Sequence, residues 1–137
     1  MPLGTKLLLD TDMLSAIMRR DQGVLSKARV YLDEYHRLSF SAITRYEILR
    51  GLKATQATRQ VEAFDRFCRS SEVLYLTDEV IIKAADIYAD LRTRGQLIGD
   101  ADILIAATAI IEGSGVVTNN QAHFDRVKDL HVENWLK

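Results

Sequence analysis

Three acidic residues stand beside apolar segments, where a charged side chain is costly unless it has a partner or a chemical role. Asp10 directly follows Leu-Leu-Leu, Asp102 directly precedes Ile-Leu-Ile-Ala-Ala, and Glu47 falls near the start of a predicted helix. If these carboxylates meet, each pair at about 4 Å costs roughly 4 kcal/mol at an effective dielectric near 20. A proton or a divalent cation must relieve that repulsion. We therefore predict that Asp10, Glu47 and Asp102 are catalytic residues that hold a metal ion.

The metal that these residues favour is a hard cation. The chain has one cysteine, Cys68, and its three histidines form no HExxH or paired-histidine pattern, so the common zinc sites are excluded. Oxygen ligands suit Mg²⁺ or Mn²⁺. Such an ion polarises a phosphate and helps to generate hydroxide for attack on phosphorus. Because we find no serine–histidine or cysteine–histidine arrangement, hydrolysis by metal-activated water is the simplest chemistry left.

Simpler structural roles are open to the same residues. Asp10 could cap the helix that follows it, and Glu47 could close a capping box with Thr44. Asp100 and Asp102 both suit the N-terminus of a helix, which explains one of them easily. We interpret Asp102 as the inward ligand and Asp100 as a supporting, peripheral residue.

Two short polar stretches complete the set of candidates. Asp12 is expected to cap a helix or to face solvent. The stretch Thr118-Asn119-Asn120 ends an apolar segment and offers a hydroxyl and amides to water, a metal or a phosphate. A simple strand-ending turn would use the same residue types.

The elements that would position these side chains alternate along the chain. Short apolar runs predict strands, and apolar residues at helical spacing predict helices between them. The predicted strands cover 6–9, 38–42, 73–76, 115–118 and 131–135, and the main predicted helices cover 13–18, 24–35, 44–54, 61–68, 78–94 and 103–111. This alternation is typical of an α/β domain with a mostly parallel sheet, in which ligands bind beyond the carboxyl ends of the strands.

Composition sets wide limits on function. The 137 residues are expected to form a single domain, 1–137, and the net charge of −1 does not by itself indicate nucleic-acid binding. Arg45, Arg50 and Arg92 are candidates for phosphate contacts, although a solvated helix face would also explain them. No segment resembles a signal peptide or a membrane span, so we expect a cytoplasmic protein with no membrane partner.

Four motifs in succession resemble those of a known family. They are LLLDTDMLS, SAITRYEILRG, IGDADILIAATA and VVTNNQAHFDRV, the last followed by DLHVENW. In this order they resemble the motifs of PIN-domain ribonucleases, and most of all the VapC toxins of type II toxin–antitoxin systems. The resemblance spans the chain from Leu7 to Trp135.

The resemblance implies a three-layer α/β/α fold with a parallel central sheet and a Mg²⁺- or Mn²⁺-dependent endoribonuclease, with transfer RNA as one candidate substrate. It implies a homodimer and a cognate VapB-type antitoxin, for which the region from Leu49 to Lys53 could offer a docking surface. Asp10, Glu47 and Asp102 match the family's three acids. Thr11 and Thr118 match its hydroxyl-bearing positions and are assigned supporting roles.

The chain departs from the family pattern at two places. Many relatives carry a fourth acid where this chain has Asn120, which we keep in the catalytic group because it could orient water or a bound ligand. Many relatives have asparagine where this chain has Asp12, which we count as a supporting residue. Asp100 is a candidate to replace part of the missing negative charge.

Two alternatives belong to other classes. Asp10-Thr11-Asp12 is also a D-x-D motif after a strand, as in haloacid-dehalogenase-like phosphatases, where Asp10 would be the nucleophile and Asp12 the general acid. Leu14 and the lack of the middle motifs of those enzymes count against it. The absence of an acid at Asn120 leaves room for a non-catalytic module that binds RNA or a partner.

Overall fold

The protein is described by a computed structural model, which covers residues 5–137. Five short strands form one sheet in the order β3-β2-β1-β4-β5, and every pair of neighbours is parallel. The strands are β1 Leu7–Leu9, β2 Ser39–Ser41, β3 Glu72–Leu74, β4 Gly115–Val117 and β5 Val132–Glu133. The helices are α1 Thr11–Met18, α2 Gln22–Tyr35, α3 Ala42–Ala54, α4 Thr58–Arg69, α5 Asp78–Thr93, α6 Asp100–Ile111 and α7 Gln121–Phe124.

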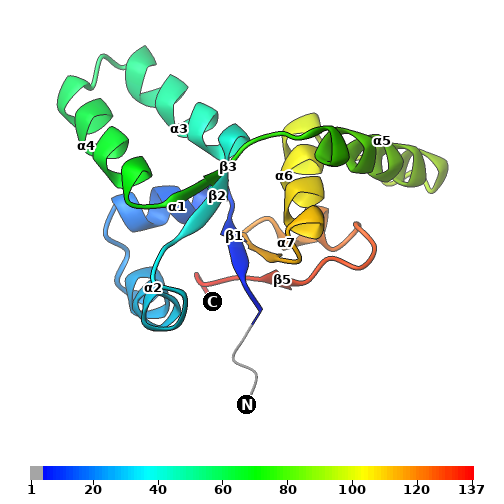
Figure 1. The fold of residues 1–137 in the computed structure, drawn as a ribbon, viewed down its shortest axis with the longest axis horizontal. Coiled ribbons are helices and arrows are strands. Elements are labelled where there is room, and N and C mark those ends of the chain that lie inside the picture. The colour runs from blue at the N-terminus through cyan, green and yellow to red at the C-terminus, as the bar shows by residue number, and fades with distance from the viewer. Residues whose placement is uncertain (1–4) are drawn as a thin grey trace.

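The central strand β1 divides the protein into two cores. Successive side chains of a strand point to opposite faces, so Leu7 and Leu9 enter one core while Leu8 enters the other. The first core is shared with α1 to α4, and the second with α5 to α7. Figure 1 shows these two groups of helices on opposite sides of the sheet. The predicted three-layer α/β/α fold is confirmed.

The helix α6 is apolar nearly all round and lies in the second core, as its sequence predicts. Ile103, Ile105 and the alanines at 106, 107 and 109 are buried. Its first turn carries Asp100 and Asp102, so the point where this helix enters the core is also where its acids stand. A buried helix of this kind fixes the position of Asp102 more firmly than a surface helix would.

Several element boundaries differ from the sequence-based expectation. The helix α3 begins at Ala42, and its cap is Ser41, whose hydroxyl accepts from the backbone N–H groups of Ile43 and Thr44. Thr44 is therefore inside the helix, and the capping-box interpretation of Glu47 is wrong. The strand β3 ends at Leu74, so the predicted extension to residue 76 is also wrong.

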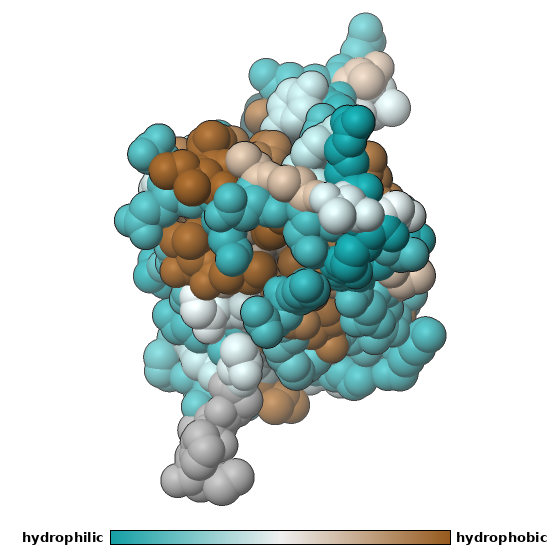
Figure 2. Space-filling model, turned by 90° about the vertical axis from the view of Figure 1, so that its right-hand side faces the viewer, coloured by the Kyte–Doolittle hydropathy of each residue, from teal (hydrophilic) through white to brown (hydrophobic). Residues whose placement is uncertain are grey.

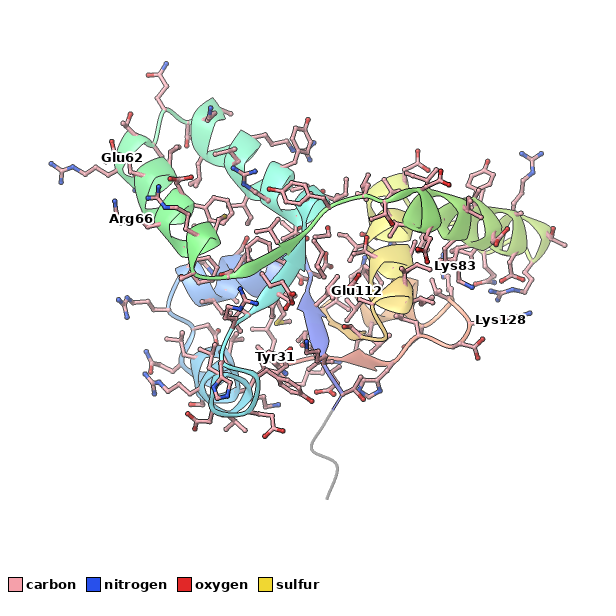
Figure 3. The ribbon with its side chains drawn as sticks, in the orientation of Figure 1. Tyr31, Glu62, Arg66, Lys83, Glu112 and Lys128 are labelled. Atoms are coloured by element: carbon pink, nitrogen blue, oxygen red, sulfur yellow. The ribbon has the colours of Figure 1, made fainter. Side chains whose placement is uncertain are left out.

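The parallel arrangement brings the carboxyl ends of β1 and β4 to the same edge of the sheet. Asp10 follows β1 and Thr118 follows β4, and Leu9 and Val117 are register partners. An open cleft of about 650 Å³ lies at the other end of β1, between α2 and the C-terminal segment. There the Tyr31 hydroxyl accepts from the Leu7 backbone N–H at 3.1 Å (Figure 3). This cleft is lined by the start of β1, and its lining does not include Asp10, Glu47 or Asp102.

No helix within residues 5–137 combines the length and the apolar character that crossing a membrane requires.

Candidate active site

Asp10 is a buried carboxyl group at the end of the central strand. It is 6% exposed, and it is the N-terminal cap of α1. The Thr118 hydroxyl donates to Oδ2 at 2.8 Å, and the Thr11 backbone N–H donates to Oδ1 at 2.8 Å. Burial raises the pKa of Asp10 from 3.8 to about 7; the charges of Asp12 and Asp102 also raise it, and the two hydrogen bonds oppose the rise. A cation at this edge would favour the ionised form of Asp10.

Asp12 lies closer to the site than expected from the sequence. Because α1 begins at Thr11, Asp12 is in its first turn, where its Oδ2 accepts from the Asn119 backbone N–H at 3.0 Å. The other oxygen, Oδ1, is buried and has no hydrogen-bond partner within residues 5–137. Burial raises the pKa of Asp12 as well. The expectation that Asp12 is a cap or faces solvent is therefore wrong.

Glu47 accepts a hydrogen bond from a hydroxyl group at the start of α1. It lies in the second turn of α3, and the Thr11 hydroxyl donates to its Oε1 at 2.6 Å. The Thr11 and Thr44 hydroxyl oxygens lie 3.4 Å apart, and Thr44 is buried. Arg50 approaches the other oxygen, Oε2, at 3.8 Å. This arrangement links Glu47 to the residue that directly follows Asp10.

Asp102 forms a small cluster with two residues that follow β4. The Asn120 side-chain amide donates to Asp102 Oδ2 at 3.4 Å and lies 2.8 Å from Nδ1 of His123. The same Nδ1 lies 3.3 Å from Asp102 Oδ2. The Asn120 backbone N–H donates to the Thr118 hydroxyl at 2.9 Å, which connects this cluster to Asp10.

His123 was not among the residues predicted from the sequence, because the metal-site patterns considered there require histidines paired with one another. The available signal was the spacing Asn120-x-x-His123, which places both residues on one turn of the short helix α7, itself not predicted. The partner carboxylate of Asp102 lies 21 residues earlier on another helix. No pattern of neighbouring residues in the sequence predicts a contact between His123 and Asp102.

Other sequence candidates lie outside this cluster. Asp100 is exposed at the first position of α6. Arg45 donates to the Tyr75 hydroxyl at 3.2 Å and lines a groove between α3 and α4. Arg92 is exposed in the last turn of α5. Of the three candidate arginines, Arg50 is the one in contact with a predicted catalytic residue.

The side chains fit a hard cation in chemical type, although they do not form a closed cage. The donors at this edge are mainly carboxylate oxygens, and the unpartnered Asp12 Oδ1 is a buried acceptor that a cation would satisfy. Within residues 5–137, no group of three or more histidine, cysteine, aspartate or glutamate side chains is arranged to hold a metal ion as the side chains stand.

The sequence model of the PIN domain family matches residues 7–130. The chain belongs to the PIN domain family. Within it, the chain is 34% identical over 129 residues to "Ribonuclease VapC1" of Methanocaldococcus jannaschii, covering 94% of this chain and 86% of that relative. It is 32% identical over 100 residues to "tRNA(fMet)-specific endonuclease VapC" of Salmonella typhimurium, covering 72% of this chain and 76% of that relative. Membership among the VapC ribonucleases of toxin–antitoxin systems is thereby confirmed.

Solved structures of PIN-domain proteins agree with this placement. The structure of DNA-bound VapBC from Salmonella typhimurium superposes with a TM-score of 0.84 at 28% identity, covering 96% of this chain and 99% of that one. VapBC2 from Rickettsia felis, bound to a DNA fragment from its promoter, gives a TM-score of 0.84 at 25% identity, covering 94% and 98%. The family match leaves no support for the haloacid-dehalogenase alternative.

Proposed function

We propose that the chain is the toxin of a type II toxin–antitoxin system, a Mg²⁺- or Mn²⁺-dependent endoribonuclease whose metal is held by Asp10, Glu47 and Asp102. The observation that carries the proposal is the buried carboxyl group of Asp10, whose pKa of about 7 reflects burial and the nearby charges of Asp12 and Asp102. Such a cluster is stable in its ionised form only if positive charge is supplied. The family membership makes RNA hydrolysis the chemistry that this charge would serve.

When bound, the cation supplies positive charge against the phosphate and activates a water molecule for attack on phosphorus. The chain's own residues hold the acids in place for it. Thr118 fixes one oxygen of Asp10 by a 2.8 Å hydrogen bond, and Thr11 fixes Glu47 by one of 2.6 Å. Asn120 stands where many relatives have a fourth acid. Here its side-chain amide donates to Asp102 and so orients that carboxylate without adding negative charge.

RNA would approach an acidic site, which repels its phosphates. Positively charged side chains near the rim of the site must therefore position the phosphates. Arg50 is the best-placed candidate because it lies 3.8 Å from Glu47 and 5.2 Å above the Tyr46 ring, which is itself exposed. Tyr46 offers an aromatic surface on which an unpaired base can stack. Single-stranded segments, such as the loops of a transfer RNA, are therefore the substrate class we propose.

The proposed protein partner is a VapB-type antitoxin. Two of the similar solved structures are of VapBC from Salmonella typhimurium and VapBC2 from Rickettsia felis. In this chain a groove of about 440 Å³ runs between α3 and α4, and it is lined by Leu49, Lys53, Glu62, Arg66 and others. Figure 3 shows Glu62 and Arg66 on the α4 side of this pair of helices. The groove includes both ends of the segment from Leu49 to Lys53 that the sequence proposed for docking.

A homodimer is proposed on the surface that α5 exposes. Ile81 is 48% exposed, Ile82 57% and Tyr88 40%, which is unusual for large apolar side chains on one helix. Figure 2, which looks from the side of the molecule on which α5 lies, shows apolar residues gathered on one part of an otherwise mostly hydrophilic face. Burial of such residues against a second copy would remove them from water.

The deciding experiment is cleavage of end-labelled total transfer RNA by purified, antitoxin-free protein, with Mg²⁺, with Mn²⁺ or with EDTA. We expect discrete cuts that require the metal and disappear in Asp102→Asn. Asp33→Asn is the matched control, because Asp33 is an exposed acid on α2. Loss of cleavage in both variants would point to general damage.

Failure on transfer RNA alone would redirect the search to messenger or ribosomal RNA. Metal-independent binding of RNA without cleavage of any class would overturn the enzymatic proposal in favour of a non-catalytic binding module.

A further inference from the structure

His123 is the one imidazole that contacts the acidic site within the part of the chain that the structure describes. Its side chain is 41% exposed, and its Nδ1 faces Asp102 Oδ2 at 3.3 Å. Neither the proposed ligand set nor the proposed reaction uses this ring. Its contacts nevertheless indicate a specific role.

The proton on the imidazole can be placed from its neighbours. The Asn120 side-chain nitrogen lies 2.8 Å from His123 Nδ1, and an amide nitrogen can only donate. Nδ1 therefore accepts, its lone pair points toward Asn120, and the neutral ring carries its proton on Nε2. The same amide nitrogen donates to Asp102 Oδ2 at 3.4 Å. Two lone pairs, one on nitrogen and one on oxygen, thus face the same partly positive amide NH2 group.

The separation of these two acceptors matches that of neighbouring ligands on a metal ion. Ligands at 90° around an octahedral cation with bonds of about 2.1 Å lie roughly 3 Å apart. The Nδ1 to Oδ2 distance is 3.3 Å. With Nδ1 accepting from Asn120, the amide group of Asn120 bridges Nδ1 and Oδ2. The side-chain amide of Asn120 occupies the position in which a cation would be attracted to both His123 Nδ1 and Asp102 Oδ2.

We propose that His123 is a specificity-determining residue of the metal site, whose Nδ1 joins Asp102 as a ligand and makes the site select a transition-metal dication over Mg²⁺. The inference rests on the proposed function, since it concerns the same site. Mg²⁺ prefers an all-oxygen shell and gives up water reluctantly, whereas imidazole nitrogen is a favourable ligand for first-row transition metals. Asn120 is central to this choice, because a carboxylate there would add a hard, charged oxygen instead.

Mn²⁺ is the probe for the test because electron paramagnetic resonance detects it directly. We expect the purified protein to bind Mn²⁺ and to show spin-echo modulation from a directly bonded ¹⁴N. In His123→Gln this modulation should vanish. Mn²⁺ affinity should fall at least about tenfold, because losing a residue that merely orients a ligand already costs about 10–100-fold. Mg²⁺ affinity, measured by competition, should change by less than about threefold, so the Mn²⁺-to-Mg²⁺ preference should shrink.

Matched variants separate this effect from damage to the fold. His131→Gln removes a histidine that instead pairs with Glu133 at 2.6 Å, and it should leave the nitrogen modulation and both affinities unchanged. Asn120→Asp should raise Mg²⁺ affinity more than Mn²⁺ affinity. His123→Ala repeats the ligand loss with a different side chain.

The outcomes distinguish this inference from the proposed function. If Mn²⁺ binds, and binding is lost in Asp102→Asn, but no nitrogen modulation appears and His123→Gln keeps the same preference, the role of His123 is wrong and the metal site stands. If neither Mn²⁺ nor Mg²⁺ binds to the unmodified protein, the metal-dependent function fails and the inference fails with it.

Discussion

Replacing Asp10 with asparagine should stabilise the metal-free protein, and the gain should depend on pH. Asp10 is 6% exposed, and its pKa stands at about 7 instead of 3.8, mainly because burial disfavours the charged form. Asp10→Asn keeps the shape of the side chain and removes the charge. The prediction therefore tests the electrostatic description of the site without requiring RNA or metal.

The magnitude follows from linkage between protonation and folding. Below pH 3.8 the carboxyl is protonated in both states, so its charge costs nothing. Between pH 3.8 and about 7 the unfolded chain releases the proton while the folded chain keeps it, so the free energy of unfolding falls as pH rises. A difference of roughly three units on the pKa scale corresponds to roughly 4 kcal/mol above pH 7.

The amide also has a cost. Asp10 accepts from Thr11 and Thr118 with different oxygens, and an asparagine has only one oxygen. Weakening one of these hydrogen bonds costs about 1 kcal/mol. We therefore expect Asp10→Asn to be about 3 kcal/mol more stable than the unmodified protein at pH 8, and equal or slightly less stable at pH 4.

Urea unfolding in EDTA, followed by far-ultraviolet circular dichroism at several pH values from 4 to 8, measures this difference. The change with pH is the informative quantity, because contributions from other carboxyl groups are shared by both proteins. Asp33→Asn, at an exposed position of α2, should show no such trend. A stability difference between Asp10→Asn and the unmodified protein that is the same at pH 4 and pH 8 would refute the reasoning.

Four further predictions concern the site and the fold. Saturating Mg²⁺ or Mn²⁺, at about a hundred times its Kd, should stabilise the protein by about 2.7 kcal/mol at pH 8; the gain should shrink at pH 5, where Asp10 is protonated, and EDTA should reverse it in thermal scans. Ser41→Ala should lose about 1 kcal/mol in urea unfolding, because its hydroxyl caps α3; an unchanged midpoint would contradict this. Gly115→Ala should cost roughly 1–3 kcal/mol, since a Cβ would lie 2.7 Å from the His131 carbonyl oxygen. Gly51→Ala, which meets nothing within 4 Å in α3, should instead gain roughly 0.5–1 kcal/mol in the same assay.

The sequence was sufficient to predict the sheet and the edge at which the acids stand. Three leucines followed by Asp10, and a further apolar run ending in Thr118, behave as parallel strands whose carboxyl ends meet. This outcome rests on periodicity and on the general geometry of parallel sheets, which depend little on the identity of distant neighbours. The burial of α6 followed in the same way from its apolar surface.

The sequence alone could not decide between local structures of similar energy, such as two possible caps for the same helix. Ser41 and Thr44 are both good helix caps, and capping energies do not separate them. The structure selects Ser41 because α3 begins directly after β2. The direction in which the Asp12 side chain points likewise depends on where α1 starts. Its contact with Asn119 joins residues that are 107 positions apart in the sequence. His123 required knowledge of α7, whose four residues carry too weak a pattern to predict.

The distance along the chain between Asp10 and Thr118 has a consequence for synthesis. The hydrogen bond that orients Asp10 spans 108 residues, and β4, which pairs directly with the central strand β1, is formed by residues 115–117. A growing chain therefore lacks Thr118, Asn120 and a neighbour of its own central strand until more than a hundred residues have followed Asp10. The proposed site therefore cannot form while the N-terminal half of the chain is being made, because the groups that orient Asp10 and Asp102 are supplied by the later residues Thr118 and Asn120.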